Sequence, residues 1–133
     1  MPLEPRYNNT VSMTIETQGD TGTASEVRIR LMQHGNQLDD QAAIRVWVCN
    51  DGTFTNSTNA TIAPVTNKGT TITTHTSNKD LTIVSDDDLP GEVWVAVTDA
   101  TAETVTLRIG PGATSSVAAD YTVILDVTHE TAE

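Results

Sequence analysis

Hydrophobic and polar residues alternate over short stretches along most of this chain. In residues 92–98 (EVWVAVT), Val93, Val95 and Val97 fall on one face and the intervening side chains on the other. A side-chain period of two is typical of a half-buried β-strand. The same alternation occurs in residues 11–16, 26–31, 43–50, 104–109 and 121–128. No stretch carries apolar residues at helical spacing over successive turns, so the pattern predicts an all-β protein.

Residues 80–110 form the most regular part of the pattern. They contain three consecutive predicted strands, joined by an acidic turn and by a short polar turn. Residues 88–91 (DLPG) supply turn chemistry, because proline pre-sets its own φ and glycine accepts a positive φ. We therefore expect these three strands to form a β-meander against which the earlier strands pack.

The alternation weakens between residues 53 and 76. Residues 58–64 and 70–74 have the pattern of short strands, and Pro64 makes the first of them an edge strand or no strand. In total the chain shows about eight or nine short strands separated by turns. This is typical of an antiparallel β-sandwich with Ig-like topology, with a closed barrel as the alternative. The expected core comprises Val27, Ile29, Val46, Val48, Leu81, Ile83, Val95, Leu107, Val123 and Leu125.

The length of 133 residues fits one domain. We expect residues 1–10 to form an extended N-terminal arm and residues 11–130 a single Ig-like β-sandwich domain. The arm holds two prolines and no periodicity, so it is either a frayed end or a segment that lies across a neighbouring subunit. In the second case Leu3 and Tyr7 are the candidate apolar anchors, and Arg6 is a candidate charge contact.

The formal charge of −11 comes from 18 acidic residues against 7 Lys and Arg. This balance argues against nucleic acid and against anionic membranes as partners, because both require clustered positive charge. Cys49 is the single cysteine, which excludes an internal disulfide. The sequence shows no signal peptide and no apolar run of membrane-spanning length, so we expect folding in a cytoplasm.

The acidic loop at residues 86–88 is a weak candidate for a calcium site. Its three carboxylates belong to Asp86, Asp87 and Asp88. Asp39, Asp40 or Asp51 could in principle converge on this loop, since calcium prefers oxygen ligands. The spacing matches no calcium-binding motif, however, so a solvated acidic turn is the favoured interpretation and no metal or other cofactor is expected.

The histidines and serines show no catalytic spacing. His34, His75 and His129 lie in separate loops or ends and are expected to be exposed polar residues. No serine sits in a Gly-x-Ser-x-Gly turn, and no three metal ligands are placed together. The sequence therefore predicts a protein that is not an enzyme.

Trp47 and Trp94 are out of phase with the aliphatic core positions. Strict alternation turns both rings outward, and exposed tryptophan is enriched at protein interfaces. The alternative is a buried Ig-type tryptophan whose phase is reversed by a β-bulge. The outward position is favoured for one of the two.

Residues 69–111 (GTTITTHTSNKDLTIVSDDDLPGEVWVAVTDATAETVTLRIGP) and 117–130 (VAADYTVILDVTHE) carry a family resemblance. They resemble small Ig-like virion proteins encoded in the structural gene clusters of tailed bacteriophages, and the resemblance extends over residues 26–129. The acidic run at residues 86–88 replaces a shorter turn of that pattern. The resemblance implies a capsid decoration or accessory protein, made in the host cytoplasm and located in the virion. The implied partners are the major capsid protein, other virion proteins and copies of the chain itself.

Two other functions fit the sequence. One is a receptor- or glycan-binding module of a head or tail fibre, in which Trp47 near Asn50 and Asp51 would form the site. The other is a subunit of the tail tube or connector. Ring-forming subunits usually extend a long hairpin between neighbours, and the sequence shows no such hairpin.

Overall fold

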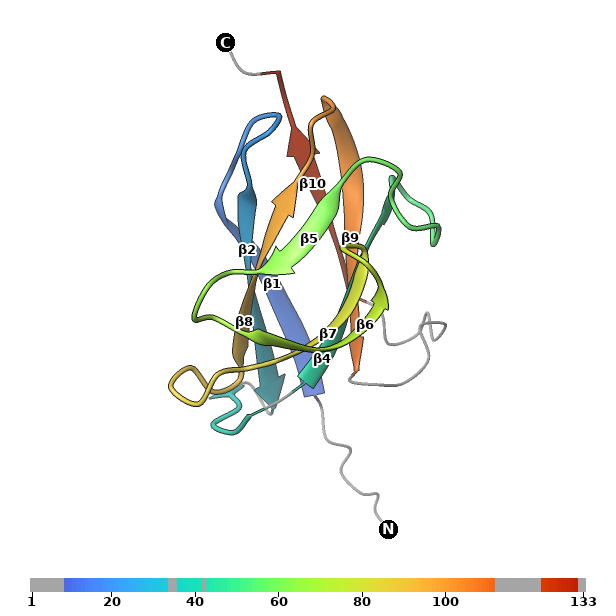
Figure 1. Cartoon of the computed structure of the whole chain (residues 1–133). Helices are drawn as coiled ribbons and strands as arrows, with labels where there is room; N and C mark the ends of the chain where they lie inside the picture. The colour runs from blue at the N-terminus through green and yellow to red at the C-terminus, as the bar shows by residue number, and fades with distance from the viewer. Residues whose placement is uncertain (1–8, 34–35, 42, 112–122, 132–133) are drawn as a thin grey trace.

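The computed structural model describes residues 9–33, 36–41, 43–111 and 123–131. Within these ranges the chain forms ten strands and no helix, arranged as two antiparallel sheets packed face to face (Figure 1). The predicted all-β sandwich is thus confirmed. In the same ranges no helix is long and apolar enough to cross a membrane.

Each sheet contains five strands. Sheet A has the order β1 (Asn9–Thr17), β2 (Ser25–Gln33), β8 (Glu92–Thr98), β5 (Thr61–Pro64), and the short β3 (Asn36–Gln37) pairs with β2. Sheet B has the order β10 (Val123–His129), β9 (Glu103–Pro111), β4 (Ala43–Asn50), β7 (Asp80–Val84), β6 (Thr70–Thr76). These neighbour orders match the A-B-E-D and G-F-C-C′-C″ arrangements of Ig domains. The chain order differs, because β5 in the D position precedes β6 and β7.

The predicted β-meander is wrong. The strands β7, β8 and β9 follow one another in the chain, but β8 pairs with β2 and β5 in sheet A. By contrast, β7 and β9 both flank β4 in sheet B. The connections at residues 85–91 and 99–102 cross from one sheet to the other. A period-two pattern shows that each strand buries one face, but it does not show which strand lies beside it.

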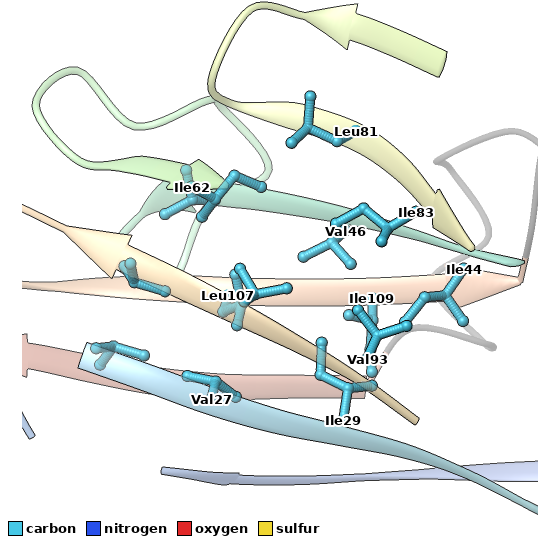
Figure 2. Packing of buried hydrophobic residues seen from close by; sticks show 14 of the residues in the cluster. Val27, Ile29, Ile44, Val46, Ile62, Leu81, Ile83, Val93, Leu107 and Ile109 are labelled. Carbon is cyan, nitrogen blue, oxygen red and sulfur yellow. The ribbon is translucent and has the colours of Figure 1, made fainter. Parts of the chain in front are cut away.

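Aliphatic side chains from both sheets fill the space between the layers (Figure 2). Val46 and Leu107 of sheet B face Val27 and Ile29 of sheet A, and all four are fully buried. The other predicted core residues found buried are Val48, Leu81, Ile83 and Val95.

Two predicted core residues on β10 differ from the rest. Leu125 is only partly buried against the core, because β10 is an edge strand of sheet B. The side chain of Val123 lies outside the described residues.

The two edge strands of sheet A, β5 and β1, can be compared with the sequence predictions. Pro64 lies in β5, the edge strand of sheet A, where its missing N–H costs no ladder hydrogen bond. At the opposite edge, β1 begins at Asn9, which pairs with Gln33 of β2. Residues 9 and 10 of the predicted arm therefore belong to sheet A. Leu3, Arg6 and Tyr7 lie outside the described residues, and their role stays a prediction.

Candidate functional site

The outer face of sheet B carries side chains that are unusually buried for a solvent-facing surface. Trp47 lies between the core residues Val46 and Val48, so it points away from the core as predicted. Trp47 is nevertheless only 4% exposed, so it is not the accessible one of the two tryptophans. β4 is the central strand of sheet B, and the Arg45 guanidinium carbon lies 5.7 Å from the centroid of the Trp47 ring.

This burial also affects the glycan-binding alternative. That site required an exposed aromatic ring beside Asn50 and Asp51. Trp47 does not offer such a ring, and the Asn50 side-chain oxygen already accepts a hydrogen bond from the Thr58 backbone N–H at 3.1 Å. The predicted constellation therefore does not form a sugar-stacking surface.

The strand register places one row of side chains across the outer face of sheet B. Ile124 of β10 is opposite Arg108 of β9, which is opposite Trp47 of β4. Trp47 is in turn opposite Asp80 of β7. Side chains directly opposite each other in an antiparallel pair are close enough to touch. The row thus runs from an exposed aliphatic residue, through a guanidinium and an indole, to a carboxylate.

Arg45 and Asp80 form the ion pair of this face. The Arg45 Nε donates to Asp80 Oδ1 at 2.9 Å, and the Nη2 donates to Oδ2 at 2.7 Å. Their side chains are 14% and 10% exposed, so the pair is largely removed from water. The hydrogen bonds from Arg45 to Asp80 raise the pKa of the guanidinium further, against the opposing effect of its burial. A two-point pair of this kind fixes the orientation of both side chains.

Arg108 holds the loop at residues 51–60 against sheet B. Its Nε donates to the Thr53 carbonyl at 2.9 Å, and its guanidinium carbon lies 4.0 Å from the centroid of the Phe54 ring. The Gly52 N–H also donates to Thr106 Oγ1 on β9 at 2.8 Å. These contacts fix the loop while leaving Phe54 59% exposed.

The exposed large hydrophobic residues of the described chain are Phe54, Ile72 and Ile124, which are 59%, 56% and 55% exposed. Phe54 and Ile124 lie on this side of the molecule, and both are neighbours of Arg108. Ile72 lies on the opposite edge strand β6, where a register shift between Thr71 and Thr73 interrupts the ladder. We call the outer face of sheet B together with Phe54 the sheet B surface. Two exposed apolar side chains beside the same arginine make this surface a candidate interaction site.

The outer face of sheet A presents a charged network around Trp94. Trp94 is partly exposed, its Nε1 donates to Glu92 Oε2 at 2.6 Å, and Lys68 Nζ lies 3.8 Å from its ring centroid. Arg28 Nη2 also donates to Glu92, at 3.1 Å. Burial by itself raises the pKa of Glu92, but the hydrogen bonds from Arg28 and Trp94 outweigh it and hold the pKa below its usual range. Trp94 is thus the tryptophan that keeps an outward, accessible edge, and its place in an interface stays a prediction.

The acidic loop lies against the segment that precedes β4. Gln37 Nε2 donates to the Pro90 carbonyl at 3.0 Å, and Gln41 Nε2 donates to the Ser85 carbonyl at 3.1 Å. These two hydrogen bonds hold the segment that contains Asp39 and Asp40 against the segment that contains the acidic run at residues 86–88. Asp51 follows the far end of β4 and does not join them. In the described part of the chain, no three His, Cys, Asp or Glu side chains are placed to hold a metal ion.

A buried polar group lies at the other end of the sandwich. His129 is 1% exposed, so the prediction of an exposed His129 is wrong. Its Nε2 lies 3.1 Å from the Val97 carbonyl and 3.3 Å from Ser25 Oγ. Leu125, Val127 and His129 are alternate residues of one strand, so they share its inward face. This alternation could have identified His129 as buried. His75 is exposed and contacts Thr82 Oγ1 at 2.8 Å, and His34 lies outside the described residues.

Two carboxyl groups meet near this polar end. Asp99 is 1% exposed, and its Oδ1 accepts the Thr101 N–H at 2.8 Å, while its Oδ2 has no hydrogen-bond donor. A protonated Glu103 can donate to the Asp99 carboxylate, and this interaction together with burial raises the pKa of Glu103. Asn59 Nδ2 donates to the same Glu103 carboxyl at 3.2 Å. The nearby Ser25 is fully buried, and its hydroxyl oxygen accepts the Gly19 N–H at 2.9 Å. Ser25 is therefore not arranged as an accessible nucleophile.

No protein-family model matches the sequence, and no curated protein matches it either. Among solved structures, the reeler domain of human F-spondin is 11% identical, with a TM-score of 0.55 over 94% of this chain and 93% of that chain. A conjugative transposon lipoprotein from Bacteroides eggerthii is 16% identical, with a TM-score of 0.48 over 92% of this chain and 98% of that chain. A cohesin module of a Clostridium perfringens family 33 glycoside hydrolase is 13% identical, with a TM-score of 0.49 over 96% and 100%. At 11% identity, the likeness to the reeler domain shows the fold alone, and that fold is a β-sandwich.

Proposed function

We propose that the protein is a non-enzymatic structural protein of a tailed-phage virion, and specifically a capsid decoration (cement) protein that binds the assembled head. The observation that carries this proposal is the resemblance of residues 69–111 and 117–130 to small Ig-like virion proteins. The β-sandwich fold is compatible with that resemblance. The two exposed apolar side chains beside Arg108, Phe54 and Ile124, support a role in protein binding.

The physical properties of the chain suit attachment to a preformed shell. A protein that binds only the assembled state stabilises that state by mass action. A rigid two-layer scaffold loses little conformational freedom on docking. The charge of −11 keeps the free protein soluble and separate until it meets its partner. Many symmetric copies then convert a modest contact into a large stabilisation of the particle.

The experiment uses heads of the phage whose structural gene cluster encodes this chain, prepared without the protein. Purified protein is added and the heads are sedimented. We expect binding to saturate at a fixed number of copies per head and to raise the temperature at which heads release their DNA. Unassembled capsid protein serves as the control and should not bind.

Three results would contradict the proposal. One is binding to unassembled subunits with the same affinity as to heads. Another is exclusive binding to isolated tails. A third is a hexameric ring of the isolated protein in light scattering, which would favour the tail tube or connector alternative.

A further inference from the structure

We infer that the sheet B surface is the docking face, and that it fits a protein surface of the assembled shell that carries apolar side chains with basic residues beside them. This inference rests on the proposed function and adds the face and the chemistry of its partner. It follows from the position of the exposed apolar residues, from the order of the side chains around them and from the distribution of charge.

The apolar residues are distributed unevenly between the two outer faces. Phe54 and Ile124, both neighbours of Arg108, belong to the sheet B surface. Sheet A contributes no large hydrophobic side chain of comparable exposure within the described ranges. In a two-layer sandwich both outer faces normally carry polar residues. The exposed apolar side chains on the outer face of sheet B do not pack in the core, so the fold does not require them to be apolar.

The side chains of this face are held in place before any partner binds. The Phe54 ring stacks on Arg108, which is itself only 7% exposed and donates to the Thr53 carbonyl. Arg45 is fixed by its two hydrogen bonds to Asp80 beside the buried Trp47. Because these groups are already ordered, docking costs little side-chain entropy.

The face is positive at its centre and negative at its rim. In the centre, Arg45 is paired with Asp80, while Arg108 contacts the Thr53 carbonyl and the Phe54 ring. At the rim, Asp126 projects from the edge strand β10 and accepts a hydrogen bond from the Thr106 hydroxyl at 3.0 Å, and Asp51 lies in the exposed loop at residues 51–60. The acidic run at residues 86–88 flanks the other end of sheet B. A partner with basic residues around an apolar patch would complement this arrangement.

The charge of the face argues against a second copy as the occupant. Self-docking would bring two acidic rims together, and like charges at short range repel. A shell surface with basic residues beside its apolar side chains meets no such repulsion.

The test compares Ile124→Asp with Thr14→Asp for binding to the decoration-free heads. Both variants add one negative charge on an exposed position of an outer strand, β10 in the first case and β1 in the second. We expect Ile124→Asp to weaken binding about tenfold or more, and Thr14→Asp to bind as the unmodified protein does. Thermal unfolding of the free variants checks that both are folded. Phe54→Ser, in an exposed loop, gives the same test if Ile124→Asp does not fold.

A second pair of variants tests the basic rim. Asp126→Asn and Glu26→Gln each remove one negative charge, from the sheet B surface and from sheet A respectively. We expect Asp126→Asn to slow association and to reduce its salt dependence, with Glu26→Gln unchanged.

The outcomes separate this inference from the proposed function. If the unmodified protein does not bind heads, the proposed function fails and the inference fails with it. If the unmodified protein and Ile124→Asp bind equally well, while Thr14→Asp binds poorly, decoration stands and the docking face is sheet A. A dimer of the free protein that Ile124→Asp dissociates would show that a second copy occupies the face, and would overturn the inference.

Discussion

Replacing Glu103 by Gln should stabilise the protein at neutral pH. The Asp99 side chain is buried and its Oδ2 has no donor. The pKa of the neighbouring Glu103 carboxyl is raised, first because its protonated form can donate to Asp99 and second because of burial. When both groups are ionised they repel each other and neither can donate a proton. A glutamine amide at position 103 supplies one N–H to Asp99 Oδ2 and keeps one oxygen for the Asn59 N–H.

The expected gain follows from the cost of a buried acceptor without a donor. That cost is about 1–3 kcal/mol, and since Glu103 itself is partly exposed we expect a gain of about 1–2 kcal/mol at pH 7–8. For a domain of this length, 1 kcal/mol corresponds to roughly 3–6 °C in Tm. Thermal unfolding followed by circular dichroism measures the difference directly. Glu26→Gln removes the same charge from the outer face of sheet A and serves as the control.

The pH dependence distinguishes this mechanism from a general charge effect. Because the folded-state pKa of Glu103 is raised, its contribution to stability is full below the unfolded pKa of about 4.3 and is lost as pH rises through the folded pKa. At low pH the protonated Glu103 already donates to Asp99. The advantage of Glu103→Gln should therefore be largest at pH 7–8 and shrink towards pH 4. A variant that is no more stable than the natural protein at pH 8, or equally favoured at every pH, would refute the reasoning.

Four further predictions concern the core, the sheet B surface, the cysteine and the N-terminus. Leu107→Ala should lower the free energy of unfolding by about 2–5 kcal/mol in urea titrations, because Leu107 is fully buried. Asp80→Ala should cost about 2–4 kcal/mol, and a double-mutant cycle with Arg45→Met should show strong coupling. Cys49 is fully buried and burial raises the pKa of its thiol, so a thiol-reactive dye should label it only at the rate of unfolding. Deleting residues 1–8 should leave the Tm of the free protein nearly unchanged and weaken its binding to heads.

The strands were predictable from sequence because a half-buried strand needs strict alternation of its side chains. The strand at residues 43–50 was predicted with the bounds that the structure gives it. Sheet membership was not predictable in the same way. A strand has the same pattern of inward apolar residues whichever of the two sheets it belongs to. The pattern of residues 80–110 therefore predicted one meander, although β8 belongs to sheet A and β7 and β9 belong to sheet B.

Burial on the outer faces depends on contacts that alternation does not encode. Trp47 has the outward phase that the sequence predicts, but it lies on the central strand between the two arginines Arg45 and Arg108. The clamp of Arg108 on Thr53 and Phe54 joins residues far apart in the chain, and neither residue belongs to a recognisable motif. His129, by contrast, was within reach of sequence reasoning, because it continues the inward phase of β10.

The most direct test of the account is an electron-microscopy map of heads saturated with the protein. We expect density for the β-sandwich at symmetric positions on the assembled shell, with Phe54 and Ile124 against the capsid and the Trp94 face directed to solvent. Density confined to the tail, or a sandwich attached through the outer face of sheet A with Phe54 and Ile124 in solvent, would contradict it.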